Sequence, residues 1–345
     1  MFHLSYKVER NSMLALGLQG SPNKQGSTVY LLNRFMAEMA DRGIRTHTID
    51  VAEKNIRPCK GCGYCEKKGF CVIRDDDMAQ EIYALLRQAE IIVTASPVFF
   101  YSVTSQLKAL IDRSQALWSR KYRFQLSDPL KRTRKGFLLS LGGSRGKQLF
   151  DGVTLVAKYF FDAVDAGFSG SLTYRNIETQ KDISQHASVN SDIASAVENL
   201  LSPMLGRKKV VFAGKGNACR SQMAAAFARH LAGDTLDVMT GGTTPLARID
   251  QNMVQVMAEM GLDLAFHSPQ PLKQVMMDHV PDNLVSMDED PAYDTFPESN
   301  RMAWNLPDAD GMHIDQVRIL RDEIENKVKS LLKSEELLHH ESLKT

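Results

Sequence analysis

The sequence lacks an excess of either charge, and it has no apolar run of membrane-spanning length. Its 345 residues include 42 basic and 41 acidic side chains, so no overall field draws it toward nucleic acid or a membrane surface. The residues after Met1 also lack the basic start and apolar core of a secretory signal. We therefore expect a cytoplasmic protein whose partners include neither nucleic acid nor membrane.

Cysteine is scarce, and four of the five cysteines are clustered in one short segment. The four are Cys59, Cys62, Cys65 and Cys71. Because the cytosol keeps isolated cysteine pairs reduced, such a cluster indicates metal ligands or electron carriers. The spacing suits a 4Fe-4S cluster, whereas structural zinc usually joins two cysteine pairs across a longer insert. Three interpretations stay open: a 4Fe-4S cluster, a zinc site and a loop that holds no metal.

The chain is longer than one hydrophobic core usually fills, so we expect two domains. In the first half, apolar strands alternate with amphipathic helices, which predicts an α/β fold with a flavodoxin-like doubly wound parallel sheet. The expected strands are 14–18, 44–51, 91–95, 136–141 and 168–174, and the expected helices are 27–43, 78–89, 104–119 and 150–166.

The alternation of strand and helix restarts after a segment rich in Ser, Asn and Ala. We place the first domain at 1–183, a linker with weak helical periodicity at 184–206, and a second α/β domain with a parallel sheet at 207–345. The second domain is expected to end in a charged helix near 314–338.

The loop 20–28 follows the first predicted strand and opens the first predicted helix. Free amides at a helix start, together with the hydroxyl groups and Lys24, suit a phosphate dianion. The loop matches neither the nucleoside-triphosphate loop nor the dinucleotide fingerprint, so a phosphomonoester such as that of FMN fits better. A tight turn with no ligand is the alternative.

Two further loops follow strands at the edge where an open parallel sheet holds its ligand. The segment 96–101 offers a rigid turn with three aromatic side chains, and 142–146 offers backbone donors. The residues predicted to contact FMN are Ser21, Asn23, Lys24, Ser27, Thr28, Pro97, Val98, Phe99, Phe100, Tyr101, Gly142 and Gly143.

These motifs, with the cysteine segment leading into 75–78, resemble the NADPH-dependent FMN reductase and iron-sulfur flavoprotein family over about residues 14–175. The resemblance implies FMN as the cofactor, NAD(P)H as cosubstrate and a homodimer or tetramer with the flavin near a subunit contact. It implies a 4Fe-4S cluster only for some members. The electron acceptor would be a small molecule or another protein.

The segment from 208 to about 335 resembles the low-molecular-weight tyrosine phosphatase and arsenate reductase family, through 210–224, 240–245 and 304–308. In that family a Cys-x5-Arg loop attacks and cradles an oxyanion. Counting back from Arg220 places Gly214 at the position of the attacking cysteine, and glycine has no nucleophile. The segment that would carry the resolving cysteines of arsenate reductases, 285–297, contains none.

The cradle without its nucleophile is expected to bind a phosphate, arsenate or sulfate ion, although a decayed scaffold is the alternative. The predicted oxyanion ligands are Lys215, Gly216, Asn217, Cys219, Arg220, Ser221 and Asp308. The sequence thus predicts an FMN-dependent NAD(P)H oxidoreductase that carries a catalytically silent oxyanion-binding domain. Two alternatives stay open: a redox or oxyanion sensor with little turnover, and a phosphatase or arsenate reductase that uses Cys219.

Overall fold

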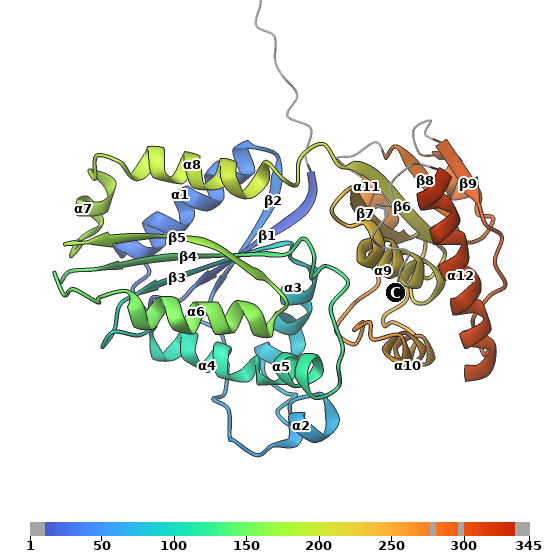
Figure 1. Ribbon diagram of the computed structural model, residues 1–345, viewed down its shortest axis with the longest axis horizontal. Helices are drawn as coiled ribbons and strands as arrows, with labels where there is room; N and C mark the ends of the chain where they lie inside the picture. The colour runs from blue at the N-terminus through green and yellow to red at the C-terminus, as the bar shows by residue number, and fades with distance from the viewer. Residues whose placement is uncertain (1–10, 277–280, 296–299, 335–345) are drawn as a thin grey trace, which may run out of the picture. The chain divides into compact units, whose positions relative to one another are not determined.

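The computed structural model describes residues 11–276, 281–295 and 300–334. The chain forms two compact units. Of the described residues, the first unit contains 11–125 and 134–203, and the second contains 126–133, 204–276, 281–295 and 300–334. Each unit is built on its own parallel sheet (Figure 1).

The first unit has a five-stranded parallel sheet with the strand order β2-β1-β3-β4-β5. The strands are β1 (Asn11–Gln19), β2 (Ile44–Asp50), β3 (Ile91–Pro97), β4 (Lys135–Gly142) and β5 (Gly167–Arg175). The strand order reverses between β1 and β3, whose register pairs Leu18 with Thr94. Ligands of doubly wound sheets bind outside the carboxyl ends of the strands at this reversal, so β1 and β3 mark the edge where a site is expected.

Helices cover both faces of this sheet, with α1, α7 and α8 on one side and α4, α5 and α6 on the other (Figure 1). The helices are α1 (Ser27–Asp41), α2 (Tyr64–Lys68), a π-helical turn (Met78–Ile82) that continues into α3 (Tyr83–Gln88), α4 (Ser105–Arg113), α5 (Gln115–Tyr122), α6 (Asp151–Ala163), α7 (Gln180–Ser184) and α8 (Val189–Leu201). The central strand β3 is buried along 91–96 because helices cover it from both sides. The flavodoxin-like architecture predicted from the sequence is confirmed.

The segment 184–206, expected as a linker, contributes a helix to the first unit. Helix α8 carries an apolar stripe at helical spacing that includes Val189, Ile193 and Val197, all buried. Asp192 of the same helix accepts a hydrogen bond from the hydroxyl of Tyr174 in β5 at 3.0 Å. Tertiary packing therefore fixes a helix whose sequence periodicity is weak.

The second unit has a four-stranded parallel sheet with the order β7-β6-β8-β9. Its elements are β6 (Lys208–Gly214), α9 (Arg220–Ala232), β7 (Leu236–Gly242), α10 (Gln251–Glu259), α11 (Leu272–Met276), β8 (Asn283–Ser286), a 3₁₀ turn (Pro291–Thr295), β9 (Asn300–Ala303) and α12 (Ile314–Ser334). Val210 and Phe212 of β6 face a core shared with α9, α10 and α12. Val211 and Ala213 face a smaller core with α11. This alternation is the period of a strand covered on both faces.

Residues 126–133, which the sequence places inside the first domain, pack as part of the second unit. The N–H of Ser127 donates to the carbonyl of Gly261 at 2.8 Å, and the N–H of Asp263 donates to the carbonyl of Ser127 at 2.9 Å. Leu126 and Leu130 are buried. The second unit is therefore assembled from two stretches of chain that are distant in the sequence.

Among the described residues, no helix is both long and apolar enough to cross a membrane.

Candidate functional site

A cavity of about 660 Å³ opens at the carboxyl ends of β1, β3 and β4. Nine of the twelve residues predicted to contact FMN line it: Ser21, Asn23, Ser27, Thr28, Pro97, Val98, Phe99, Gly142 and Gly143. The fold brings the three loops together because the three strands are neighbours in the sheet. The volume lies within the usual range for cofactor-sized ligands.

The start of α1 forms one end of this cavity. Its N-cap is Gly26, which provides no side-chain hydrogen bond, so the first amides of the helix have no capping partner from that residue. Ser27 and Thr28, the first two helical residues, are buried and line the cavity, and each carries a hydroxyl group. An uncapped helix start with adjacent hydroxyls is suited to a phosphate group.

The loop before α1 is held by its own hydrogen bonds. Gln19 is buried, and its side chain accepts from the N–H of Ser21 at 2.5 Å and donates to the carbonyl of Ser21 at 2.7 Å. The hydroxyl of Ser21 accepts from the N–H of Asn23 at 3.1 Å. The carboxamide of Asn23 accepts from the N–H of Gln25 at 3.0 Å. These amides are therefore committed to the loop itself, which leaves the start of α1 as the source of backbone donors.

Three predicted contacts do not line the cavity: Lys24, Phe100 and Tyr101. The ammonium group of Lys24 forms an ion pair with Glu53 instead. Phe100 and Tyr101 occupy the tip of a two-residue turn closed by hydrogen bonds between Phe99 and Ser102. Both tip residues adopt positive φ, 47° and 58°, and both side chains are exposed. The turn carries these aromatic groups away from the cavity, while Phe99 stays within it.

A fourth segment, 177–180, lines the same cavity and was missed by the sequence analysis. It follows β5 and precedes α7, which begins with a capping box between Thr179 and Asp182. This Thr-x-x-Asp pattern was the available signal for the helix start. A side-chain carbon built at Gly143 would lie 3.1 Å from Cγ of Glu178, so the third and fourth loops approach closely.

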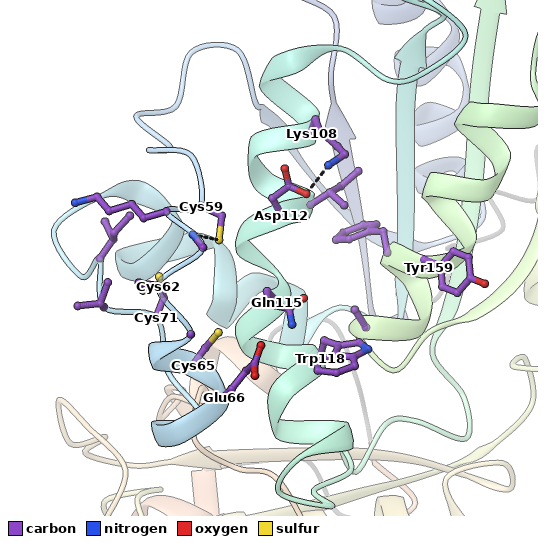
Figure 2. A pocket seen from close by; sticks show the side chains of 18 of the residues that line it. Cys59, Cys62, Cys65, Glu66, Cys71, Lys108, Asp112, Gln115, Trp118 and Tyr159 are labelled. Carbon is purple, nitrogen blue, oxygen red and sulfur yellow. Dashed lines mark hydrogen bonds and ion pairs between the residues drawn. The ribbon is translucent and has the colours of Figure 1, made fainter.

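The four clustered cysteines line a second cavity of about 730 Å³, shown in Figure 2. Its other walls come from α4, α5 and α6, including Gln115, Trp118 and Tyr159. Cys59 and Cys62 are exposed, whereas Cys65 and Cys71 are half-buried. Burial is the largest cause that raises the pKa of the Cys65 thiol, and the nearby Cys59 and Cys71 add to it. All four cysteines therefore line one space.

Within the described ranges, no three side chains of His, Cys, Asp or Glu are gathered closely enough to hold a metal ion. The exposed arm of the loop has room to move, because Gly61 and Gly63 adopt positive φ and nothing lies within 4 Å of a side-chain carbon built on either. The donor set has the chemistry of a cluster site. Cluster binding would therefore require the thiols to approach one another more closely.

A buried ion pair fixes the base of the cysteine loop. Arg113 and Asp76 are fully buried and are joined at 2.5 Å. The guanidinium of Arg113 also donates to the carbonyl of Arg57 at 2.9 Å and to that of Ile73 at 3.1 Å, on either side of the four cysteines. Although burial opposes it, hydrogen bonding from Arg113 lowers the pKa of Asp76. The two ends of the loop are thus pinned together while its tip is exposed.

A third cavity, of about 410 Å³, lies in the second unit between β6 and α9. All seven predicted oxyanion ligands line it: Lys215, Gly216, Asn217, Cys219, Arg220, Ser221 and Asp308. Residues 244–250 accompany the loop, and their N–H groups donate to the carbonyls of Lys215, Gly216 and Ala218 at 2.9 Å. These hydrogen bonds fix the backbone of the loop at the edge of the cavity.

Asn217 braces the loop rather than offering its side chain to a ligand. It is buried at positive φ, and its amide nitrogen donates to the hydroxyls of Ser221 at 2.9 Å and Thr240 at 2.7 Å. Its carbonyl oxygen accepts from Gln222 at 3.1 Å and from the N–H of Gln270 at 2.8 Å. All four hydrogen-bonding positions of this carboxamide are used.

Gly214, the last residue of β6, leaves space where the loop to α9 begins. A side-chain carbon built there would lie 3.4 Å from the hydroxyl of Ser221 and 3.5 Å from Met287, which are ordinary contact distances. The backbone therefore accommodates a larger residue at this position, and the missing nucleophile is a property of the sequence rather than of a collapsed loop.

The guanidinium group of Arg220 already has hydrogen-bond acceptors within the protein. Its guanidinium donates to Asp288 at 3.0 Å, to Asp308 at 3.5 Å and to the carbonyl of Leu306 at 2.7 Å. Asp288 also accepts from the N–H of Lys215 at 3.2 Å. An incoming anion would therefore compete with Asp288 for the guanidinium of Arg220 and the N–H of Lys215.

Cys219 is unsuited to nucleophilic attack. Burial raises the pKa of its thiol to about 12, and neighbouring Asp250 adds to this effect, while Arg220 opposes it. Because the thiolate is the nucleophile, a thiol with this pKa is inert near neutral pH. This shift counts against Cys219 as a nucleophile, and the alternative of a phosphatase or arsenate reductase that uses Cys219 stays a prediction.

Two family models match the chain. The NADPH-dependent FMN reductase model matches residues 13–149, and the low-molecular-weight phosphotyrosine protein phosphatase model matches residues 209–343. An iron-sulfur flavoprotein of Methanocaldococcus jannaschii is 38% identical over 133 residues, which are 39% of this chain and 64% of that protein. The chain thus spans less than two thirds of that flavoprotein.

Similar proteins also include arsenate reductases. A relative from Halobacterium salinarum, whose name refers to arsenate reductase, is 34% identical over 122 residues, covering 33% of this chain and 84% of that protein. A solved arsenate reductase in its phosphate-binding state is 28% identical, with a TM-score of 0.33, and covers 37% of this chain and 98% of that structure. Residues 13–149 therefore match the NADPH-dependent FMN reductase family, and residues 209–343 match the low-molecular-weight phosphotyrosine protein phosphatase family.

Proposed function

We propose that this protein is an FMN-dependent NAD(P)H oxidoreductase whose flavin binds in the cavity of the first unit. The observation that carries this proposal is the convergence of three loops on an uncapped helix start with two buried hydroxyls, at the edge where the strand order reverses. The match to the FMN reductase model and the similarity to iron-sulfur flavoproteins support it.

The phosphate of FMN would bind at the start of α1, held by the amides and hydroxyls of Ser27 and Thr28. Glu178 is the only described residue lining this cavity whose side chain is ionisable, so the phosphate would be held by neutral dipoles. The ring would lie between 97–99 and 142–143, where glycine allows close approach. When bound, FMN accepts hydride from NAD(P)H and releases electrons singly or in pairs.

The cysteine loop is proposed as a site for a 4Fe-4S cluster with Cys59, Cys62, Cys65 and Cys71 as ligands. The pinned base of the loop would position Cys71, and the open arm would complete the ligand set. A small molecule or another protein would accept the electrons, and the protein is proposed to act as a homo-oligomer in the cytoplasm.

An absorption spectrum of the full chain purified without oxygen, with analysis of iron and sulfide, tests the cofactors. A flavin spectrum that NADPH or NADH bleaches is expected, followed by repeated turnover when a quinone, free flavin or ferricyanide is supplied. Protein that is colourless and takes up no added FMN would overturn the proposal. Reduction that occurs once without turnover would favour a sensor.

The second unit is proposed to bind an oxyanion without transforming it. The cavity supports this proposal, because the loop 215–221 at the start of α9, which includes Arg220, lines it, while Gly214 provides no nucleophile. Titrating the full chain with phosphate, arsenate or sulfate should raise the unfolding midpoint of this unit, because a ligand that binds only the folded state stabilises it. Sodium chloride at matched ionic strength is the control. An equal midpoint in oxyanion and chloride would contradict oxyanion binding.

A further inference from the structure

Three fully buried hydroxyl groups connect the loops that form the cavity of the first unit. They belong to Ser96 at the end of β3, Thr104 before α4 and Ser140 near the end of β4. Ser140 donates to the carbonyl of Ser96 at 2.8 Å, and the hydroxyl of Ser96 accepts from the N–H of Thr104 at 3.2 Å. The chain of hydrogen bonds thus runs from β4 across β3 toward β1.

Thr104 makes the contact with the phosphate loop. Its hydroxyl donates to the carbonyl of Gly20 at 2.5 Å and accepts from the N–H of Leu107 at 3.3 Å, which caps α4. The N–H of the same peptide unit, on Ser21, is held by the buried Gln19. Both polar groups of the Gly20–Ser21 peptide are therefore fixed by buried side chains, one on each side.

Gly20 is tightly packed against its neighbours. A side-chain carbon built there would lie 2.9 Å from the carbonyl of Ala95 and 2.9 Å from Leu107. The N–H of Gly20 donates to the same Ala95 carbonyl at 2.8 Å. The loop thus touches β3 and α4 directly, and the orientation of its first peptide depends on the hydroxyl of Thr104.

We propose that Thr104 is a positioning residue for the flavin phosphate, acting through the Gly20–Ser21 peptide, while Ser140 positions the loops at the ring end. This inference rests on the proposed FMN site. Thr104 itself does not line the cavity, so it would act on the cofactor only through the loop. Loss of its hydroxyl would leave the Gly20 carbonyl without its donor in a buried place, and the loop would rotate to find another.

The test compares two flavins that differ only in the phosphate. FMN and riboflavin are titrated into the flavin-free full chain, and the quenching of flavin fluorescence is followed. Thr104→Val should weaken FMN binding about ten-fold, which corresponds to about 1.4 kcal/mol, and leave riboflavin binding within about two-fold. Thr104→Ser keeps both hydrogen bonds and should restore FMN binding. Ser140→Ala should weaken both flavins equally.

Thr94→Val is the matched control. The hydroxyl of Thr94 is fully buried in β3, two residues from Ser96, and it has no hydrogen-bond partner within the described part of the chain. The same substitution there should change neither flavin affinity. If Thr104→Val weakens FMN and riboflavin equally, or weakens neither, the proposal is wrong even though the cavity binds flavin. If the wild-type chain binds neither flavin, the proposed function fails instead.

Discussion

The two units of this protein build their candidate anion sites on the same element, the start of a helix that follows a parallel strand, yet they treat charge in opposite ways. In the first unit, α1 begins with hydroxyls, and the nearby Lys24 is paired with Glu53 outside the cavity. In the second unit, α9 begins at Arg220, whose guanidinium is already bonded to Asp288 and Asp308. One site relies on neutral dipoles alone, whereas the other contains a cation that an anion must share with carboxylates.

The largest expected effect comes from returning a nucleophile to the second site. Gly214→Cys places a thiol where the backbone has room for it, beside the hydroxyl of Ser221. The thiolate would displace the alcohol of a phosphate monoester, Asp308 would protonate that leaving group, and water would then release phosphate. We expect phosphatase activity with an aryl phosphate, absent from the wild type.

The matched control is the double variant Gly214→Cys with Asp308→Asn, in which activity should fall about a hundred-fold or more, because the general acid is lost. A folded Gly214→Cys variant with no activity at any pH would show that the cradle no longer stabilises a phosphoryl group.

The second prediction tests whether the first site binds the flavin phosphate through hydroxyl groups rather than through a positively charged side chain. Ser27→Ala in the first unit should weaken FMN binding about ten-fold, because a hydrogen bond to a charged group is lost. Lys24→Ala should weaken it less than about two-fold, because the ammonium group is exposed and paired with Glu53. Fluorescence titration of the flavin measures both. A larger loss from Lys24→Ala would mean that the lysine turns toward the bound phosphate.

The third prediction concerns the unfolding of the two units, which should respond differently to a substitution in the segment 126–133. Leu130→Ala should lower the free energy of unfolding of the second unit by about 2 kcal/mol or more, because Leu130 is buried with that unit. Flavin release on heating reports the first unit, and the fluorescence of Trp304, measured with Trp118→Phe in both proteins, reports the second. A matched Leu155→Ala change, at an exposed position on α6, should alter neither transition. Loss of flavin at lower temperature in Leu130→Ala would contradict the assignment of this segment.

The smallest effect concerns pH. The pKa of Cys219 is raised by burial from 9.0 to about 12, so the folded state favours the neutral thiol. Its contribution to stability is present below pH 9 and is lost as pH rises from about 9 to about 12. Chemical unfolding of the second unit across this range should show that decline, and Cys219→Ala should remove part of it. An unchanged profile in the variant would indicate that Cys219 is accessible to water.

Much of the fold was predictable because strong local signals coincide with it. The turn of Gly, Pro and Ser before residue 27 predicts the start of α1, and the apolar run of β3 predicts a central strand. Helix α8 was harder, because its stripe is stabilised by packing on the sheet rather than by strong periodicity. The place of the segment 126–133 in the second unit could not be predicted, because nothing in its composition indicates which core buries it.

Within the sites, the sequence indicated which loops meet but not how each side chain is used. Lys24 has the chemistry of a phosphate ligand, but an acidic neighbour from another loop binds it. Asp288 is far from Arg220 in the sequence, and only the sheet order brings the two together. Such long-range pairings determine the charge of a site and are not encoded in any local motif.

The assembly of the second unit from two stretches has a consequence for synthesis on the ribosome. Residues 126–133 emerge about 200 residues before the end of α12, so at about 5–20 residues per second they wait about 10–40 seconds for their partners. During that interval Leu126 and Leu130 have no core to enter, whereas the sheet of the first unit is complete once β5 has been made. A nascent chain stalled after residue 203 should therefore present this segment to a chaperone, and a full-length chain should not.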